Sequence, residues 1–458
     1  MRKEQLQALF NEPGCDKNQS KSDKVRKAGC AGQLKPGATA GGCAFDGAKI
    51  VLQPITDAAH LVHGPIPCEG NSWDSRNVHS SGPQTYRTGF TTDVGELDIV
   101  YGGEKKLYHA IKEIAERFDP PAIFVYQTCV TAIIGDDIVK VCKVARERLN
   151  KPVIPVVAPG FVGKKNLGTK LAGETLLEYV IGTEEPDDIG PTDINLIGEY
   201  NVAGEYNQIR PLFDRIGIRV RASITGDARY HDITKAHRAR VNMMVCSQAL
   251  MNLARKMQER WDIPYFEGSF YGIGETSTAL RRITHMLVER GADPALIDRA
   301  EAVIAEEEAK AYAHLAPFRE RVAGKRVLLY TGGVKTWSVA SALQEAGMVV
   351  IGSSMRKATE DDKIRARAIL GEGSPLYGTI PQREMFRMLK EGQADILLSG
   401  GRTQFIALKA KLPWLDINQE RHHPYAGYDG AVTLIENIDR AIGNPIWAQI
   451  RTKAPWET

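Results

Sequence analysis

Residues 121–157 read PAIFVYQTCVTAIIGDDIVKVCKVARERLNKPVIPVV, and this segment sets the expected fold class. An apolar run precedes a turn, an amphipathic helical segment and a second apolar run, which is the order of a βαβ unit. The same order returns in DINLIGEYNVAGEYNQIRPLFDRIGIRVRASI (193–224) and in KRVLLYTGGVKTWSVASALQEAGMVVIGSS (325–354). Gly217 and Gly347 are predicted to stop the two later helices. Parallel βαβ units need helices on both sheet faces, so we predict three Rossmann-like, doubly wound α/β domains.

The chain has 458 residues, a length that favours about three domains. We expect an irregular N-terminal arm at 1–50, where Gly, Lys and Ser are frequent and periodicity is weak. Domains are then predicted at 51–190, 191–322 and 323–458. Residues 293–325 are rich in helix formers with helical apolar spacing, which predicts a long connecting helix.

The charges nearly balance: 59 Lys and Arg against 56 Asp and Glu give a net charge of +3. This balance argues against nucleic acid or a membrane surface as a partner. There is no uninterrupted apolar run of membrane-spanning length, and the first residues are polar, so we expect a cytoplasmic protein. Seven cysteines, an odd number in a long chain, favour free thiols or metal ligands over disulfides.

Common motifs exclude several classes of enzyme. The chain lacks GxxxxGK[ST], and YGIGETS (271–277) lacks the third glycine of GxGxxG, which disfavours ATPases and nucleotide-dependent dehydrogenases. GGVKT (332–336) is either an anion-binding loop or a plain strand-to-helix turn. The absence of GxSxG, HExxH and CxxC gives no support to a hydrolase, a zincin, a compact zinc site or a thioredoxin-type pair.

Three dispersed cysteines suggest iron–sulfur chemistry. Cys43 lies in GGCAFDGA, Cys68 in HGPIPCEGNSW and Cys129 in YQTCVTAIIGDD, each beside Gly or Pro or in a turn. Thiolates are the ligands of iron–sulfur clusters, and small neighbours let backbone N–H groups approach the sulfides. Three ligands leave one iron for another chain or an exogenous group. The alternative is that each cysteine is a small buried apolar residue.

The other cysteines fall into two groups. Cys246, in NMMVCSQALMNLARKM, is predicted at a strand-to-helix junction, where a helix N-terminus favours the thiolate; the alternative is again a small buried apolar residue. Cys142 lies within a helical pattern and fits the buried apolar alternative, while Cys15 and Cys30 lie in the polar arm. Four histidines are either metal ligands or hydrogen-bonded structural residues: His60, His63, His422 and His423.

From about residue 40 almost to its end, the sequence resembles the nitrogenase component 1 superfamily. The motifs that carry the resemblance are GGCAFDGA (41–48), HGPIPCEGNSWDSR (63–76), GGEKKLYHAI (102–111), TCVTAIIGDDI (128–138), GEYNVAGE (198–205), GIGETSTALRRI (272–283), LLYTGGVKTW (328–337) and AGYDGAV (426–432). They occur in the order found in the superfamily.

The resemblance implies three Rossmann-like domains and an α2β2 heterotetramer with a sister protein, NifN. It implies that Cys43, Cys68 and Cys129 hold a [4Fe–4S] cluster whose fourth thiolate comes from NifN. It also implies that Cys246 binds one end of the iron–molybdenum cofactor or of its all-iron precursor. In the catalytic subunit a histidine binds the other end, and aligning KLPWLDIN (411–418) puts Asn418 at that position.

Asn418, which stands where the catalytic subunit has a histidine, distinguishes a scaffold function from a catalytic one. An amide is a poor, neutral ligand compared with imidazole, so a cluster held by one thiolate can be remodelled and released. Lys335 and Arg402 resemble basic positions that face the cofactor and its homocitrate, with a solvated surface role as the alternative. Lys164 and Lys165, in GFVGKKNLG, belong to a further family segment and are predicted to guide an anionic cluster inward.

The resemblance therefore implies a scaffold for maturation of the iron–molybdenum cofactor rather than a catalytic subunit. It implies that NifB donates the precursor and that the nitrogenase Fe protein, with MgATP, supports insertion of molybdenum and homocitrate. The cofactor-free nitrogenase MoFe protein would then accept the product. Two alternatives stay open: a catalytic oxidoreductase subunit of the nitrogenase or protochlorophyllide reductase type, and a binding module with structural cysteines.

Overall fold

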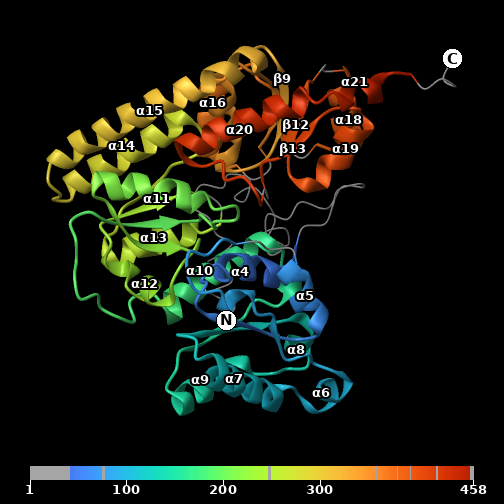
Figure 1. The fold of residues 1–458 in the computed structure, drawn as a ribbon. Coiled ribbons are helices and arrows are strands. Elements are labelled where there is room, and N and C mark those ends of the chain that lie inside the picture. Colours follow the sequence, from blue (N-terminus) through green and yellow to red (C-terminus); the bar gives the residue numbers. More distant parts are fainter. Residues whose placement is uncertain are drawn as a thin grey trace, which may run out of the picture.

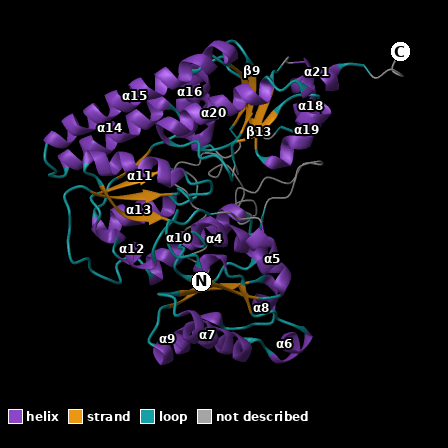
Figure 2. Cartoon of the chain, in the orientation of Figure 1, coloured by secondary structure: helices purple, strands orange, loops and turns teal. Residues whose placement is uncertain are grey.

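The computed structural model describes residues 42–74, 78–245, 249–355, 358–378, 380–391, 394–418 and 421–453. Three sheets follow one another along these residues, and every strand pair within them is parallel. Figure 2 shows the sheets with helices layered against them. The predicted fold class, three Rossmann-like doubly wound α/β domains, is confirmed.

The first sheet has the strand order β2-β1-β3-β4. Its elements are α4 (Ala44–Leu52), β1 (Ala59–His63), α5 (Ile66–Asp74), η1 (Thr85–Arg87), β2 (Phe90–Thr91), α6 (Glu96–Tyr101), α7 (Glu104–Phe118), β3 (Ile123–Gln127), α8 (Cys129–Ile133), α9 (Ile138–Leu149), β4 (Val153–Val156), η2 (Gly160–Val162) and α10 (Lys165–Tyr179). Alternate side chains of β3 enter two cores. Ile123 and Val125 pack with α7 and α9, whereas Phe124 and Tyr126 pack with α4 and α10. Helices therefore cover both faces, as a parallel sheet requires.

The middle sheet has the order β6-β5-β7-β8. Its elements are β5 (Asp193–Ile197), α11 (Glu205–Ile216), β6 (Arg219–Ile224), α12 (Tyr230–Thr234), η3 (Ala236–Arg238), β7 (Val241–Met244), α13 (Met251–Trp261), β8 (Tyr265–Glu267) and α14 (Ile273–Glu289). Gly217 caps α11 with φ +89° and donates its N–H to the Phe213 carbonyl, 2.9 Å away. The predicted stop at this glycine is confirmed.

The third sheet has the order β11-β10-β9-β12-β13. Its elements are α15 (Ala295–Val322), β9 (Arg326–Tyr330), α16 (Val334–Glu345), β10 (Val349–Ser354), α17 (Glu360–Leu370), β11 (Leu376–Tyr377), α18 (Gln382–Glu391), β12 (Ile396–Ser399), η4 (Gly401–Thr403), α19 (Gln404–Lys409), β13 (Trp414–Asp416), α20 (Gly427–Ile442) and α21 (Ile446–Arg451). The predicted connecting helix is α15, and Gly347, with φ +75°, follows the end of α16 as predicted. None of the described helices is both long and apolar enough to cross a membrane.

The predicted irregular arm, residues 1–50, does not extend past Cys43. Residues 1–41 lie outside the described part, but α4 begins at Ala44 and is almost wholly buried against α10. Glycines allow this packing: a Cβ at Gly47 would lie 1.9 Å from the Lys165 carbonyl oxygen, and one at Gly168 would lie 1.8 Å from that of Ala44. Gly47 also lowers the helix propensity of this segment, which explains why the sequence pattern did not indicate the helix.

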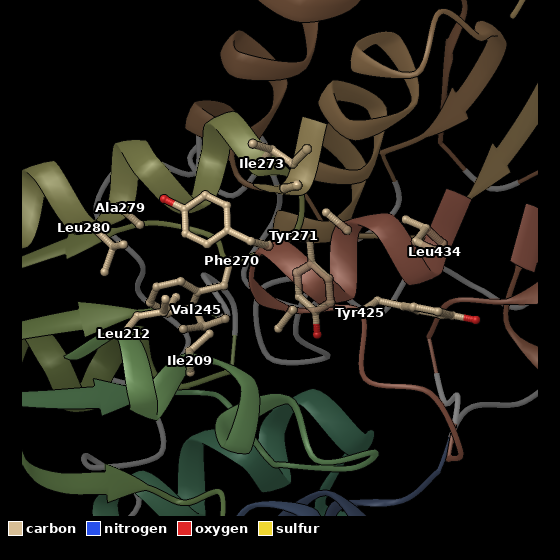
Figure 3. Close-up of a cluster of buried hydrophobic side chains, with 14 of the residues drawn as sticks. Ile209, Leu212, Val245, Phe270, Tyr271, Ile273, Ala279, Leu280, Tyr425 and Leu434 are labelled. Carbon is tan, nitrogen blue, oxygen red and sulfur yellow. The ribbon is translucent and has the colours of Figure 1, made fainter. Parts of the chain in front are cut away.

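One hydrophobic core joins the middle and third domains. It contains Ile194 of β5, Phe213 of α11, Leu329 of β9 and Leu434 of α20. In Figure 1, α14, α15 and α20 lie side by side above α11 of the middle domain. Figure 3 shows Tyr271 in this core between side chains of the middle domain and those near α20. These two domains therefore pack as one unit around apolar side chains.

Candidate functional site

Three cysteines from different elements lie together in the first domain. Cys43 is the N-cap of α4, Cys68 lies in the first turn of α5, and Cys129 is the first residue of α8. All three are free thiols of intermediate exposure. Cys43 also forms an isolated antiparallel bridge with Lys164, which holds it beside the segment that leads into α10.

Gly160 gives two of these sulfurs their space. A Cβ on Gly160 would lie 2.9 Å from Cys129 Sγ and 3.1 Å from Cys43 Sγ, closer than ordinary van der Waals contact. The Gly160 backbone therefore approaches both sulfurs so closely that a side chain at this position would occupy the space between them. The sequence analysis did not single out this glycine; the available signal was its place after the apolar run that ends in Val156.

Cys68 belongs to the same group of thiols. Burial raises the pKa of the Cys68 thiol, and the neighbouring groups of Cys129 and Cys43 raise it further. In the absence of metal this thiol therefore keeps its proton, and coordinated iron would stabilise the deprotonated form instead.

The donor set fits a cluster better than a single ion. Among the residues that the structure describes, no three His, Cys, Asp or Glu side chains are close enough together to bind one metal ion. In an iron–sulfur cluster each thiolate bonds a different iron, so the thiolates are more widely spaced. Three neighbouring thiols, two of them at the Gly160 backbone, can supply three such ligands and leave one iron for a ligand from elsewhere.

Backbone contacts at the end of β1 position Cys129. The hydroxyl groups of Thr128 and Thr131 both donate to the His63 carbonyl, each at 3.0 Å, and fix the start of α8 against β1. Gly64 is needed there, since a Cβ on it would lie 2.1 Å from Thr128 Oγ1. The carboxyl ends of two neighbouring parallel strands thus deliver Cys129 to the site, as expected for an α/β sheet.

The buried histidines in this domain are structural residues. The His60 Nε2–H group donates to the Ile55 carbonyl at 3.1 Å, and Nδ1 accepts from the Tyr126 hydroxyl at 2.8 Å. Burial lowers the pKa of His60 to about 3. His63 is paired through Nε2 with Asp136 at 2.9 Å and contacts Thr92 through Nδ1. With both ring nitrogens of each imidazole occupied, neither histidine has a nitrogen available for a metal.

The remaining cysteines and histidines lie elsewhere. Cys142 is buried on α9, and burial raises the pKa of its thiol to about 12, which fits the small apolar alternative. His422 and His423 are exposed, with their rings 6.5 Å apart. Cys246, Cys15 and Cys30 lie outside the described residues; Val245, the residue before Cys246, is buried in the core shared by the middle and third domains.

A second group of predicted residues lies at the carboxyl edge of the third sheet. Lys335, in the first turn of α16, donates through Nζ to the Ile417 carbonyl at 2.9 Å and lies 4.5 Å from the centre of the Tyr271 ring. Asn418 follows β13, and its side-chain oxygen accepts a hydrogen bond from the Thr331 hydroxyl. Lys335 and Asn418 are therefore brought together, each bonded within this edge.

The surroundings of this edge are acidic as well as basic. Arg402 is exposed in η4, two residues after Gly400, and a Cβ at Gly400 would lie 3.1 Å from the Asn418 amide nitrogen. Glu199, in the loop after β5, is buried; burial and the charge of Glu205 raise its pKa to about 7, while Lys335 lowers it. Sequence analysis missed Glu199, although its motif was among those that carry the resemblance.

Comparisons with known proteins agree with the fold and the motifs. The family model described as nitrogenase component 1 type oxidoreductase matches residues 43–443. The nitrogenase iron-molybdenum cofactor biosynthesis protein NifE of Mesorhizobium japonicum is 62% identical, with 99% of this chain and 91% of that protein covered. NifE of Klebsiella pneumoniae is 48% identical over the full length of both. A solved structure of nitrogenase Cp1 at pH 5 superposes with a TM-score of 0.84 at 28% identity, covering 98% of this chain and 100% of that one. This chain is therefore a member of the nitrogenase component 1 family, and its sequence groups it with the NifE proteins.

Proposed function

We propose that this chain, in complex with NifN, is the scaffold on which an all-iron precursor is matured to the iron–molybdenum cofactor. The observation that carries the proposal is the grouping of three cysteines: the Cys43 and Cys129 sulfurs meet at Gly160, and Cys68 lies close enough for both to raise the pKa of its thiol. Such a group supplies three thiolates for a cluster and leaves one iron open. Relatives named as cofactor biosynthesis proteins, 48–62% identical over nearly the whole chain, favour assembly over catalysis.

A [4Fe–4S] cluster at this site is shared with NifN, which supplies the fourth thiolate. Large exposed apolar side chains on α5, α6 and α8 support a protein partner here, since exposed apolar side chains are typical of an interface. They are Ile66 on α5, Leu97, Val100 and Tyr101 on α6, and Ile133 on α8, with exposed fractions between 55% and 83%. The three helices lie together at one side of the first domain (Figure 1). The assembly is an α2β2 heterotetramer.

The precursor is cargo, and Cys246 anchors one end of it. Val245, the residue before Cys246 in the sequence, follows β7 at the same edge of the middle sheet as the Glu199 loop, which follows β5. Lys335 and Arg402 offset the negative charge of the cluster and of homocitrate. Asn418 provides no imidazole, and its amide oxygen already accepts from Thr331. One protein bond to the cluster suits later release.

Other proteins complete this sequence of events. NifB donates the precursor, and the nitrogenase Fe protein, with MgATP, supplies reducing equivalents while molybdenum and homocitrate are inserted. The cofactor-free MoFe protein then accepts the product. In this proposal the chain holds and orients clusters, and its basic side chains balance their charge.

A donor assay separates this function from catalysis. The chain is co-purified with NifN without oxygen, loaded with precursor, and incubated with Fe protein, MgATP, molybdate and homocitrate. We expect the mixture to activate cofactor-free nitrogenase and to reduce acetylene poorly by itself. Acetylene turnover without donation would instead assign a catalytic subunit. The Cys246→Ala variant should lose precursor on desalting; wild-type retention would remove Cys246 from the site.

A further inference from the structure

A buried ion pair joins two of the cysteine-bearing helices. Lys49 of α4 is 1% exposed and donates through Nζ to the carboxylate of Glu69, which is 4% exposed, and to Ser72 Oγ at 3.0 Å. Ser72 also donates to the Glu69 carbonyl at 3.0 Å. Glu69 directly follows Cys68, and Ser72 lies one turn after Cys68 on the same face of α5. The pair therefore ties the helix capped by Cys43 to the helix that carries Cys68.

The strand that leads to Cys129 borders the same polar group. Tyr126 of β3 is fully buried; burial raises the pKa of its hydroxyl, and the charge of Glu69 raises it further. Tyr126 packs edge to face with Phe45 of α4, with ring centres 6.1 Å apart. Lys49 and Glu69 therefore join α4 to α5 and lie near Tyr126 of β3, the strand that leads to Cys129.

Stability alone does not account for such a pair. Removing two charges from water is costly, and replacing a buried ion pair by apolar residues of similar volume often leaves stability unchanged or higher. Directional hydrogen bonds, however, define one relative position for two helices, whereas apolar contacts tolerate several. A metal cluster needs its thiolates held in one arrangement.

We propose that Lys49, acting through Glu69 and Ser72, is the positioning residue that holds Cys68 against Cys43 for cluster binding. This inference rests on the proposed function, because it presumes a cluster at the three cysteines. Lys49 does not contact the metal in this account. Its bonds fix the rotation of α5 about its axis and so the direction of the Cys68 sulfur.

The test uses the complex with NifN, purified without oxygen from cells that lack NifB, so that the resident cluster alone contributes iron. Wild type is compared with Lys49→Met, with the double variant Lys49→Met/Glu69→Met and with Ser72→Ala. The control is Arg221→Met, which breaks another buried pair, between Arg221 and Asp193 in the middle domain. Iron per chain, the rate of iron loss to a chelator, the EPR signal of the reduced cluster and the melting temperature are measured.

We expect Lys49→Met to lose iron at least fivefold faster than wild type. The double variant should regain the wild-type melting temperature, since no lone charge is left buried, yet still lose iron several-fold faster and show an altered EPR signal. Arg221→Met should lower the melting temperature without changing that signal.

If the double variant has the melting temperature, the rate of iron loss and the EPR signal of wild type, the positioning role is overturned. If the double variant does not fold, Ser72→Ala decides, and iron loss at the wild-type rate overturns the inference. An iron-free wild-type complex would overturn the proposed cluster itself, which distinguishes the two failures.

Discussion

Gly160→Ala adds one methyl group where two of the proposed ligand sulfurs meet. The new Cβ would lie 2.9 Å from Cys129 Sγ and 3.1 Å from Cys43 Sγ, whereas relaxed contacts are about 3.5–4.0 Å. The Cys129 sulfur must therefore retreat by roughly 0.6 Å or more. Gly160 does not have a positive φ, so alanine fits the backbone and the effect comes from the methyl group alone.

The cost of Gly160→Ala depends on whether a cluster is bound. Without metal, the thiols rotate away and the free energy of unfolding changes little. When a cluster is bound, iron–sulfur bonds fix the positions of the sulfurs. The added methyl group then raises the free energy of the cluster-bound protein by about 1–3 kcal/mol. Cluster affinity should then drop about 5- to 150-fold.

The assay measures iron loss to a chelator from the oxygen-free complex, together with the melting temperature of the metal-free chain. Gly70→Ala is the matched control, because Gly70 lies on α5 beside the site and a Cβ there meets nothing within 4 Å. It should keep its iron and gain up to about 1 kcal/mol of stability. If Gly160→Ala retains iron as wild type does, or if Gly70→Ala loses iron equally fast, the assignment of Gly160 to the cluster site is refuted.

Further variants address the remaining residues. Cys43→Ala should lose the interface cluster and weaken assembly with NifN, measured by iron analysis and gel filtration; unchanged iron content would contradict its role as a ligand. Asn418→His adds an imidazole and should slow transfer of the matured cluster to cofactor-free nitrogenase. Undiminished transfer would show that the end of the cluster opposite Cys246 does not lie at Asn418. Burial and Glu205 raise the pKa of Glu199 from 4.5 to about 7. Its stabilising effect is therefore complete below about pH 4.5 and lost as the pH rises through about 7. Glu199→Gln should flatten the pH dependence of the melting temperature in that range, and an unaltered slope would argue against the shift.

Local pattern predicted the three sheets because each βαβ unit is built from short-range periodicity. The pattern also indicated cysteines in turns and loops as candidate ligands, since the loops after parallel strands meet at one edge of a sheet. Gly160 and the pair Lys49–Glu69 depend instead on approaches between distant segments. A lysine on an amphipathic helix is normally solvated, so nothing in the pattern marks Lys49 as buried.

The same limit applies at the third sheet. Asn418 and Lys335 were predicted from resemblance, but not their internal bonds to Thr331 and to the Ile417 carbonyl. Those bonds depend on β9 and β13 lying on either side of β12, a placement that only the strand order of the sheet defines.

The apolar core that joins α11 and α14 to α20 links the folding of the middle domain to the synthesis of α20, which begins long after α14 ends in the sequence. β5 and α11 leave the ribosome long before α20 is synthesised, so their apolar faces stay uncovered during elongation. Domains usually fold in order as they emerge. Here the middle domain has to wait for α20, and a nascent chain stalled before Gly427 is expected to be a chaperone substrate and to be degraded rapidly.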